Sequence, residues 1–132
     1  MDKKLITTGF AFITVAIALG AFAAHGLKTT GVPADKIESF QTGVRYLFYS
    51  GFGFLLLVPL QDKFDFMFNT QYRQIFWGTL LFSLSIFTLV LLPILELSTP
   101  RFLGPITPIG GILIFIGWFS LLVKYLRNSY LS

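Results

Sequence analysis

The sequence has no cysteine, one histidine and few charged residues, which make up 12% of its 132 residues. The lack of cysteine excludes disulfide bonds and thiolate metal sites, and a single histidine leaves too few imidazoles for a histidine-based metal cluster. A soluble domain has about 25% charged residues. Because 55% of the residues are apolar instead, the chain has too little polar surface to cover a water-soluble globule, and we expect lipid to solvate most of it.

Four long apolar stretches account for this composition. Each approaches the roughly 20 residues that a helix needs to cross a hydrocarbon core about 30 Å thick. We predict an all-α polytopic membrane protein, one domain over residues 1–132, in which four transmembrane helices form an antiparallel bundle. The predicted spans are residues 5–24, 42–60, 75–95 and 106–125.

The first stretch also has features of a secretory signal peptide. It follows Asp2-Lys3-Lys4, and Ala21-Phe22-Ala23 resembles a cleavage site. The apolar region of a signal peptide has about 7–15 residues. The uncharged stretch from Leu5 to Ala24 has twenty, which favours a transmembrane helix that is retained.

The link between the first two spans predicts a short amphipathic helix at the outer interface, over Pro33 to Gln41. Ile37, Phe40 and Val44 recur there at helical spacing, opposite charged residues. Gly43 then allows a bend into the second span. One continuous helix from Pro33 to Leu60 is a nearly equal alternative, because glycine permits a break without requiring one.

Prolines indicate two further helix ends. Thr107 and Pro108 have the pattern of an N-cap followed by a proline in the first turn, so we expect the fourth helix to begin there. Pro93 should kink or end the third helix and leave Glu96 at the interface. We interpret Glu96 as a solvated acid at the membrane boundary, because an acid within the membrane is costly.

The basic residues predict the orientation. Six Lys or Arg residues lie at the N-terminus, after the second span and in the C-terminal tail, whereas four lie in the first and third connections. Because cytoplasmic loops carry the excess of Lys and Arg, both ends are predicted on the cytoplasmic side of a bacterial inner membrane. The same loop charges account for the net charge of +4, which we therefore do not attribute to nucleic acid binding.

Small residues predict where helices pack closely. Ala16, Gly20 and Ala24 recur at every fourth position of the first span, which leaves a smooth stripe for another backbone. In the fourth span, Gly110 with its neighbour Gly111, and Gly117 seven residues later, have the same role. We favour packing within the chain, and contact with a second subunit is the open alternative.

A candidate polar cluster consists of His25, Gln41, Arg45 and Tyr46, which the spans would bring to the outer mouth of the bundle. Such a group could bind an anionic headgroup, a polar ring or a proton. We favour a simpler interpretation, in which His25 and the following Gly26 cap the first helix. For an Arg at the end of a span, reaching toward the interface is the default.

Four short blocks, spread over nearly the whole chain, share their residues with a known family. They are Gly20-Ala21-Phe22-Ala23-Ala24-His25-Gly26-Leu27, Gln41-Thr42-Gly43-Val44-Arg45-Tyr46, Phe82-Ser83, and Ile106-Thr107-Pro108-Ile109-Gly110-Gly111 with Gly117-Trp118. These blocks resemble domain of unknown function 423, a family of small four-span inner-membrane proteins in bacteria, with mitochondrial relatives and no established activity. Ser50 departs from the family pattern, which tends to carry a second histidine there, and Ser83-Leu84-Ser85-Ile86-Phe87 lacks the usual glycine and tyrosine. A mechanism that needs two histidines is therefore not expected.

Three classes of function can be compared. A structural or accessory protein, acting through helix contacts with itself or a larger membrane complex, fits the small-residue stripes, the short loops and the lack of ionisable residues deep in any span. The alternative is a small transporter or channel for a solute, ion or lipid-like molecule, although a proton-coupled transporter usually needs an acid within a helix. Its path would use the hydroxyls of Ser83, Ser85, Thr88 and Ser120. An enzyme is least favoured, because no catalytic set stands out. We expect no catalytic residue, metal or cofactor, and the lipid bilayer as a partner.

Overall fold

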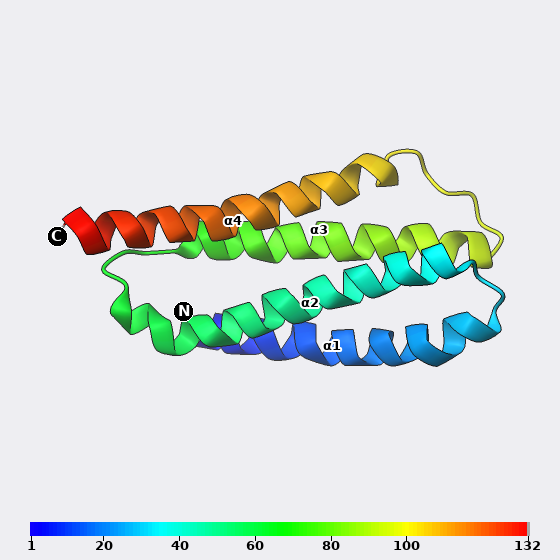
Figure 1. Ribbon diagram of the computed structural model, residues 1–132, viewed down its shortest axis with the longest axis horizontal. Helices are drawn as coiled ribbons and strands as arrows, with labels where there is room; N and C mark the ends of the chain where they lie inside the picture. Colours follow the sequence, from blue (N-terminus) through cyan, green and yellow to red (C-terminus); the bar gives the residue numbers. More distant parts are fainter. Residues whose placement is uncertain (132) are drawn as a thin grey trace.

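The computed structural model describes residues 1–131 and contains four long α-helices. These are α1 (Asp2–Thr29), α2 (Ala34–Leu60), α3 (Asn69–Ile94) and α4 (Leu103–Leu131), and a short 3-10 helix, η1 (Gln61–Lys63), follows α2. Within these residues there is no β-strand. The helices run antiparallel in succession, so both termini lie at the same end of the bundle (Figure 1). Each helix is long and apolar enough to cross a membrane, which confirms the predicted architecture.

Helices that are neighbours in sequence are also neighbours in space. α1 packs on α2, α2 on α3, and α3 on α4, so α1 and α4 are the outer helices (Figure 1). In the described part of the chain, the backbones of α2 and α4 do not come into close contact. The space between these two helices is therefore filled by side chains or left as grooves.

Aromatic and aliphatic side chains form the core. The ring of Phe12 on α1 stacks on Phe76 of α3, with 5.7 Å between centroids, and lies 5.9 Å from Phe54 of α2. Most of the surface of each helix nevertheless faces outward. Only 22% of the most apolar window of α4 is buried, against 44% for α3. α4 is therefore the most exposed of the four helices, and α3 is the most enclosed.

The first helix extends past His25 and Gly26, where the sequence predicted its end. α1 continues through His25 and Gly26 to Thr29, and Gly31 takes the left-handed conformation, with φ 73°. Thr30 ends the helix, because its hydroxyl and its backbone N–H both donate to the carbonyl oxygen of Leu27. The prediction that His25 and Gly26 cap the helix was wrong. The extra turn carries Leu27 into the core, where it is fully buried.

The amphipathic segment is not a separate helix. α2 is continuous from Ala34 to Leu60, so the predicted break at Gly43 was wrong and the alternative of one helix was right. The reason is packing. Gly43 is buried against α3, where an added Cβ would lie 2.7 Å from Cε1 of Phe87. Its lack of a side chain serves close contact and not a bend.

Of the two helix ends predicted from prolines, the end of α3 was right and the start of α4 was wrong. α3 ends at Ile94, directly after Pro93, as predicted, and Glu96 is exposed in the connection with a positive φ of 56°. α4 begins at Leu103, however, so Pro108 lies inside the helix and the prediction that Thr107 is its N-cap was wrong. The Thr107 hydroxyl instead bonds to α3 across the interface.

Candidate functional site: helix contacts and surface grooves

Polar side chains of α3 bond to all three other helices. The bonds are Tyr72–Thr8 (2.7 Å) to α1, Thr79–Ser50 (2.6 Å) and Ser83–Gly43 carbonyl (2.8 Å) to α2, and Ser85–Thr107 (2.6 Å) and Gln71–Ser120 (2.7 Å) to α4. Hydrogen bonds between helices in a membrane fix how two helices are aligned. α3 is therefore the helix that sets the alignment of the bundle.

The buried hydroxyls are engaged in pairs. A hydroxyl has one hydrogen to donate. Thr79 donates it to the carbonyl oxygen of Ile75, 2.7 Å away, so its oxygen accepts the hydrogen of Ser50. Both side chains are almost fully buried. By the same reasoning Ser85 donates to a carbonyl of its own helix and accepts from Thr107. These hydroxyls serve packing between helices.

Two glycine pairs bring backbones close together. An added Cβ on Gly110 of α4 would lie 2.7 Å from the carbonyl oxygen of Gly78 on α3. An added Cβ on Gly51 of α2 would lie 3.1 Å from the carbonyl oxygen of Gly9 on α1. Of these four residues, only Gly110 was predicted from the sequence to pack closely. The tight contacts thus lie within each hairpin, between α1 and α2 and between α3 and α4.

The other small residues predicted for packing differ in how closely they are approached. Gly117 is buried, and a Cβ there would lie 2.6 Å from Cγ1 of Ile75. Gly111 has room, since the nearest atom would be 3.6 Å away on the ring of Phe82. In α1, Ala16 is fully buried, whereas Gly20 and Ala24 are half-buried beside it.

The missed contact in α1 has a sequence signal. Gly9, Ala16 and Ala23 are spaced by seven residues, and all three are buried. A seven-residue repeat is the pattern of helices that pack along a long antiparallel or parallel seam. Ala16, Gly20 and Ala24, which are four residues apart, begin on the same face, but Gly20 and Ala24 lie at its edge.

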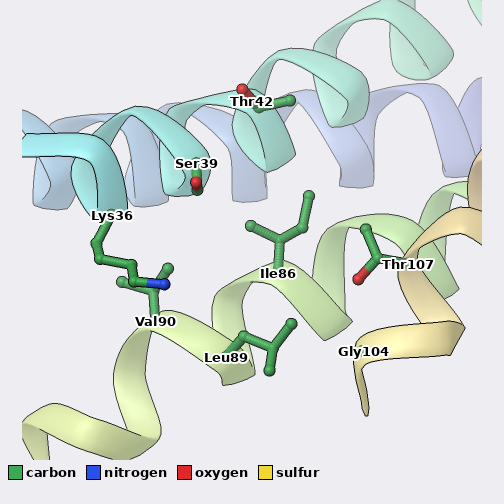
Figure 2. A pocket seen from close by; sticks show the side chains of 8 residues that line it. All are labelled: Lys36, Ser39, Thr42, Ile86, Leu89, Val90, Gly104 and Thr107. Carbon is green, nitrogen blue, oxygen red and sulfur yellow. The ribbon is translucent and has the colours of Figure 1, made fainter. Parts of the chain in front are cut away.

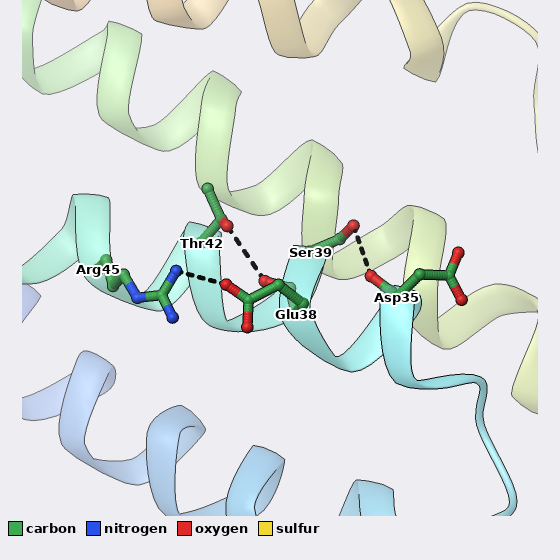
Figure 3. A network of polar contacts seen from close by, with 5 residues as sticks. All are labelled: Asp35, Glu38, Ser39, Thr42 and Arg45. Atoms are coloured by element: carbon green, nitrogen blue, oxygen red, sulfur yellow. Dashed lines mark hydrogen bonds and ion pairs between the residues drawn. The ribbon is translucent and has the colours of Figure 1, made fainter.

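The four members of the predicted polar cluster lie in different surroundings. Arg45 forms an ion pair with Glu38, which lies two turns earlier on the same helix, with 2.8 Å between Nη1 and Oε1 (Figure 3). The ring of Tyr46 packs on Phe82 of α3, with 4.5 Å between centroids. Gln41 is half-buried and His25 is exposed on α1. Arg45 thus has its partner on its own helix.

Local bonds also occupy the hydroxyls at the start of α2. Ser39 donates to the carbonyl oxygen of Asp35 (3.0 Å) and Thr42 donates to that of Glu38 (3.1 Å), both four residues back in the helix (Figure 3). Such bonds destabilise a helix only slightly, and they occupy the one hydrogen that the hydroxyl could donate to another partner. The polar side of this segment is thus a solvated helix face, opposite the fully buried Phe40.

The outer face of α1 carries a second stripe of small residues. They are spaced by four and three residues, and all are exposed: Thr7, Ala11, Thr14, Ala18 and Ala21. The stripe is on the side of α1 opposite Ala16, which faces α2. Bulky residues of α1 are also exposed and flank this stripe, among them Phe10, Ile17 and Phe22. The exposed face of α4 has no such stripe between its bulky residues, which are Ile109, Ile112, Phe115, Ile116, Phe119 and Leu122.

Two grooves lie beside α2 and α4, one near each end of the bundle. The first has a volume of about 350 Å³ and is lined by residues of α2, α3 and α4, with Lys36 reaching toward Val90 (Figure 2). Its polar groups include Ser39 and Thr42, which are already bonded to their own helix. The second groove has a volume of about 470 Å³ and lies between α2 and α4. Its lining is almost entirely apolar: Gly53, Leu56, Leu57, Leu60, Lys63, Phe64, Trp118, Leu121, Leu122 and Tyr125.

Metal-ligating side chains are scattered. Within residues 1–131, no group of three His, Cys, Asp or Glu side chains lies close enough to hold a metal ion. The buried amide oxygens of Gln71 and Gln74 lack a donor in the same region. Two isolated amide oxygens do not make a metal site, which needs four or more ligands in most proteins.

The chain is similar to proteins from bacteria and yeast. The family described as "Protein of unknown function (DUF423)" matches residues 19–111. A UPF0382 membrane protein of Bacillus subtilis, YwdK, is 34% identical over 94% of this chain and 99% of its own length. The UPF0382 inner membrane protein YgdD of Escherichia coli is 34% identical over 91% of this chain and 84% of its own. A UPF0382 membrane protein of Schizosaccharomyces pombe is 32% identical over 83% and 90%.

No solved structure matches this chain. The family match covers α2, α3, the C-terminal part of α1 and the start of α4. It therefore includes the Ser50–Thr79 hydroxyl pair between α2 and α3 and the close contact of Gly78 with Gly110. Four helices able to cross a membrane agree with relatives that are membrane proteins. The chain therefore belongs to the DUF423 family of multi-span membrane proteins.

Proposed function

We propose that this protein is a structural or accessory subunit that acts through helix contacts, with itself or with a larger membrane complex, and has no catalytic activity of its own. The outer face of α1 carries the proposal. Its exposed residues Thr7, Ala11, Thr14, Ala18 and Ala21 form a smooth strip along most of the helix.

The physical reason is that lipid and protein favour different surfaces. Acyl chains are as apolar as a leucine side chain, so helices in a membrane associate by close packing, and small residues allow that approach. The face of α1 is of this kind. The bulky face of α4, with Phe115 and Phe119 exposed, gives no such approach and suits lipid. We therefore place the partner on α1.

The internal hydroxyls favour this role over a small transporter. A polar path would need hydroxyls that face open space. Ser83 donates to the Gly43 carbonyl of α2, and Thr88 donates to the Leu84 carbonyl one turn back. Hydroxyls used in this way support packing and leave little to line a path.

The test is to fill the strip. Ala18→Phe adds a large side chain to the exposed face of α1, and Ile112→Phe places the same side chain on the exposed face of α4, where the residue is already bulky, as the control. After mild detergent extraction, we expect the wild-type chain to purify at fixed stoichiometry with itself or a partner. Ala18→Phe should abolish that association and Ile112→Phe should keep it. A wild-type chain that runs as a monomer alone, or an association that survives Ala18→Phe, would contradict the proposal.

We also propose that the protein resides in the inner membrane of a bacterium, with both ends in the cytoplasm. The end that holds both termini carries six of the ten Lys and Arg residues. The lack of cysteine makes the test direct. A single cysteine at Ser129 should be blocked only by a reagent that enters cells, whereas one at Thr99 should react with a reagent that does not. The reverse pattern would show the opposite orientation.

A further inference from the structure

The apolar groove between α2 and α4 runs inward from the end of the bundle that holds both termini. Gly53 and Trp118 lie deepest along their helices, and Lys63 and Tyr125 lie at the outer end. The eight residues from Gly53 to Leu60 span about 10 Å along the helix. The groove is therefore long enough to hold part of a lipid acyl chain. It also runs along the helices, which is the direction in which the acyl chains of a bilayer extend.

The depth of the groove comes from a glycine. Trp118 packs over Gly53, where an added Cβ would lie 2.7 Å from Cη2 of the indole. The ring forms the inner end, and leucines of the two helices form the walls. These surfaces offer an acyl chain contact on several sides, whereas the convex surface of α4 offers contact on one.

The outer end has the charge that a phosphate needs. Lys63 is exposed on η1, and in the described part of the chain it has no ion-pair partner. The same end of the bundle carries six Lys or Arg residues against three Asp. Tyr125 adds a hydroxyl at the same level.

We propose that this groove binds one anionic phospholipid, with an acyl chain along the leucines and the phosphate at Lys63. A basic residue near the membrane surface contributes about 1 kcal/mol toward an anionic lipid, which corresponds to about a fivefold preference over a zwitterionic one. The proposal does not depend on the accessory role, because the small-residue strip is on the face of α1 that points away from α2, whereas the groove lies between α2 and α4.

The two tryptophans report on the groove and on a control surface. Trp118 lines the groove, and Trp77 is 54% exposed on α3, outside it. Trp77→Phe leaves Trp118 as the reporter, and Trp118→Phe leaves Trp77. The full chain would be placed in phosphatidylcholine vesicles that contain phosphatidylglycerol or phosphatidylcholine brominated at the middle of the acyl chain, which quenches tryptophan fluorescence.

We expect brominated phosphatidylglycerol to quench Trp118 with about five times the relative affinity of brominated phosphatidylcholine. Lys63→Gln should reduce that ratio to about one. Lys4→Gln, which removes the same charge from α1 at the same end, should leave it unchanged, and Trp77 should show no preference. Equal quenching of Trp118 by the two lipids, or a preference that survives Lys63→Gln, would overturn the proposal.

A second measurement does not need the tryptophan variants. Native mass spectrometry of the unmodified chain, released from detergent with both lipids present, should show one retained phosphatidylglycerol. Lys63→Gln should lose it and Lys4→Gln should keep it. Retention of either lipid without preference would also overturn the proposal.

Discussion

Gly78 on α3 and Gly110 on α4 face each other so closely that a Cβ on Gly78 would lie 2.9 Å from the carbonyl oxygen of Gly110. The atoms that a side chain would meet there are backbone atoms of α4 and the Cβ of Leu113, none of which can rotate away. The two helices can approach because neither residue has a side chain. This contact fixes the separation of the second hairpin.

Gly110→Ala should therefore destabilise the bundle by about 1–3 kcal/mol, the usual cost of forcing an extra methyl group into a packed site. The matched control is Gly104→Ala in the same helix, where an added Cβ meets nothing within 4 Å. Alanine is a better helix former than glycine, so the control should be neutral or slightly stabilising. Unfolding in detergent, followed by circular dichroism, measures both. Equal stability of the two variants would contradict the close contact.

The Ser50–Thr79 pair should couple α2 to α3. Interhelical hydrogen bonds in a membrane contribute about 0.6 kcal/mol on average. A double-mutant cycle with Ser50→Ala and Thr79→Ala should give a coupling energy of this size. Thr88→Ala is the control partner for Ser50→Ala, because the Thr88 hydroxyl bonds within its own helix. The cycle with Thr88 should show no coupling, and a coupling as large as that with Thr79 would count against the pair.

His25 should make little difference to stability. His25 is exposed, four residues before Thr29, the last residue of α1, and it is not among the residues that cap the helix. Exposed substitutions away from caps and core are usually within about 0.5 kcal/mol. His25→Asn should therefore unfold at nearly the same temperature as the wild type. A loss of more than about 1 kcal/mol would restore the capping role that the sequence indicated.

Substitution of Gly31 should lower the stability because of the backbone conformation of this residue, and not because of neighbouring atoms. Its φ is 73°, and a Cβ there would meet no atom within 4 Å. An L-residue in the left-handed region costs about 1–2 kcal/mol, and asparagine tolerates it better than alanine. Gly31→Ala should lower the stability by about 1 kcal/mol, and Gly31→Asn should lower it less. The same unfolding experiment separates the two, and an equal loss in both variants would argue against the strained turn.

The sequence alone determined the four spans and their antiparallel order. Hydropathy adds along contiguous residues, and a stretch of about 20 apolar residues has few stable alternatives to a membrane-crossing helix. The same is true of Pro93, whose ring ends α3 through a local effect. The close packing of Gly110 and Gly117 also followed from the sequence, because the lack of a side chain is itself the requirement for contact.

Only the tertiary structure decided where α1, α2 and α4 begin or end and which surfaces meet. A break at Gly26 or Gly43 is permitted by the residue, but a broken helix leaves backbone groups without partners, which costs several kcal/mol in a membrane, whereas a cap contributes about 1 kcal/mol. The continuous helices also place Leu27 and Phe40 in the core. The pairing of Ser50 with Thr79, 29 residues apart, depends on how α2 and α3 are aligned, and no local pattern records that alignment. The outward face of α1 is likewise known only because α2 occupies the opposite one.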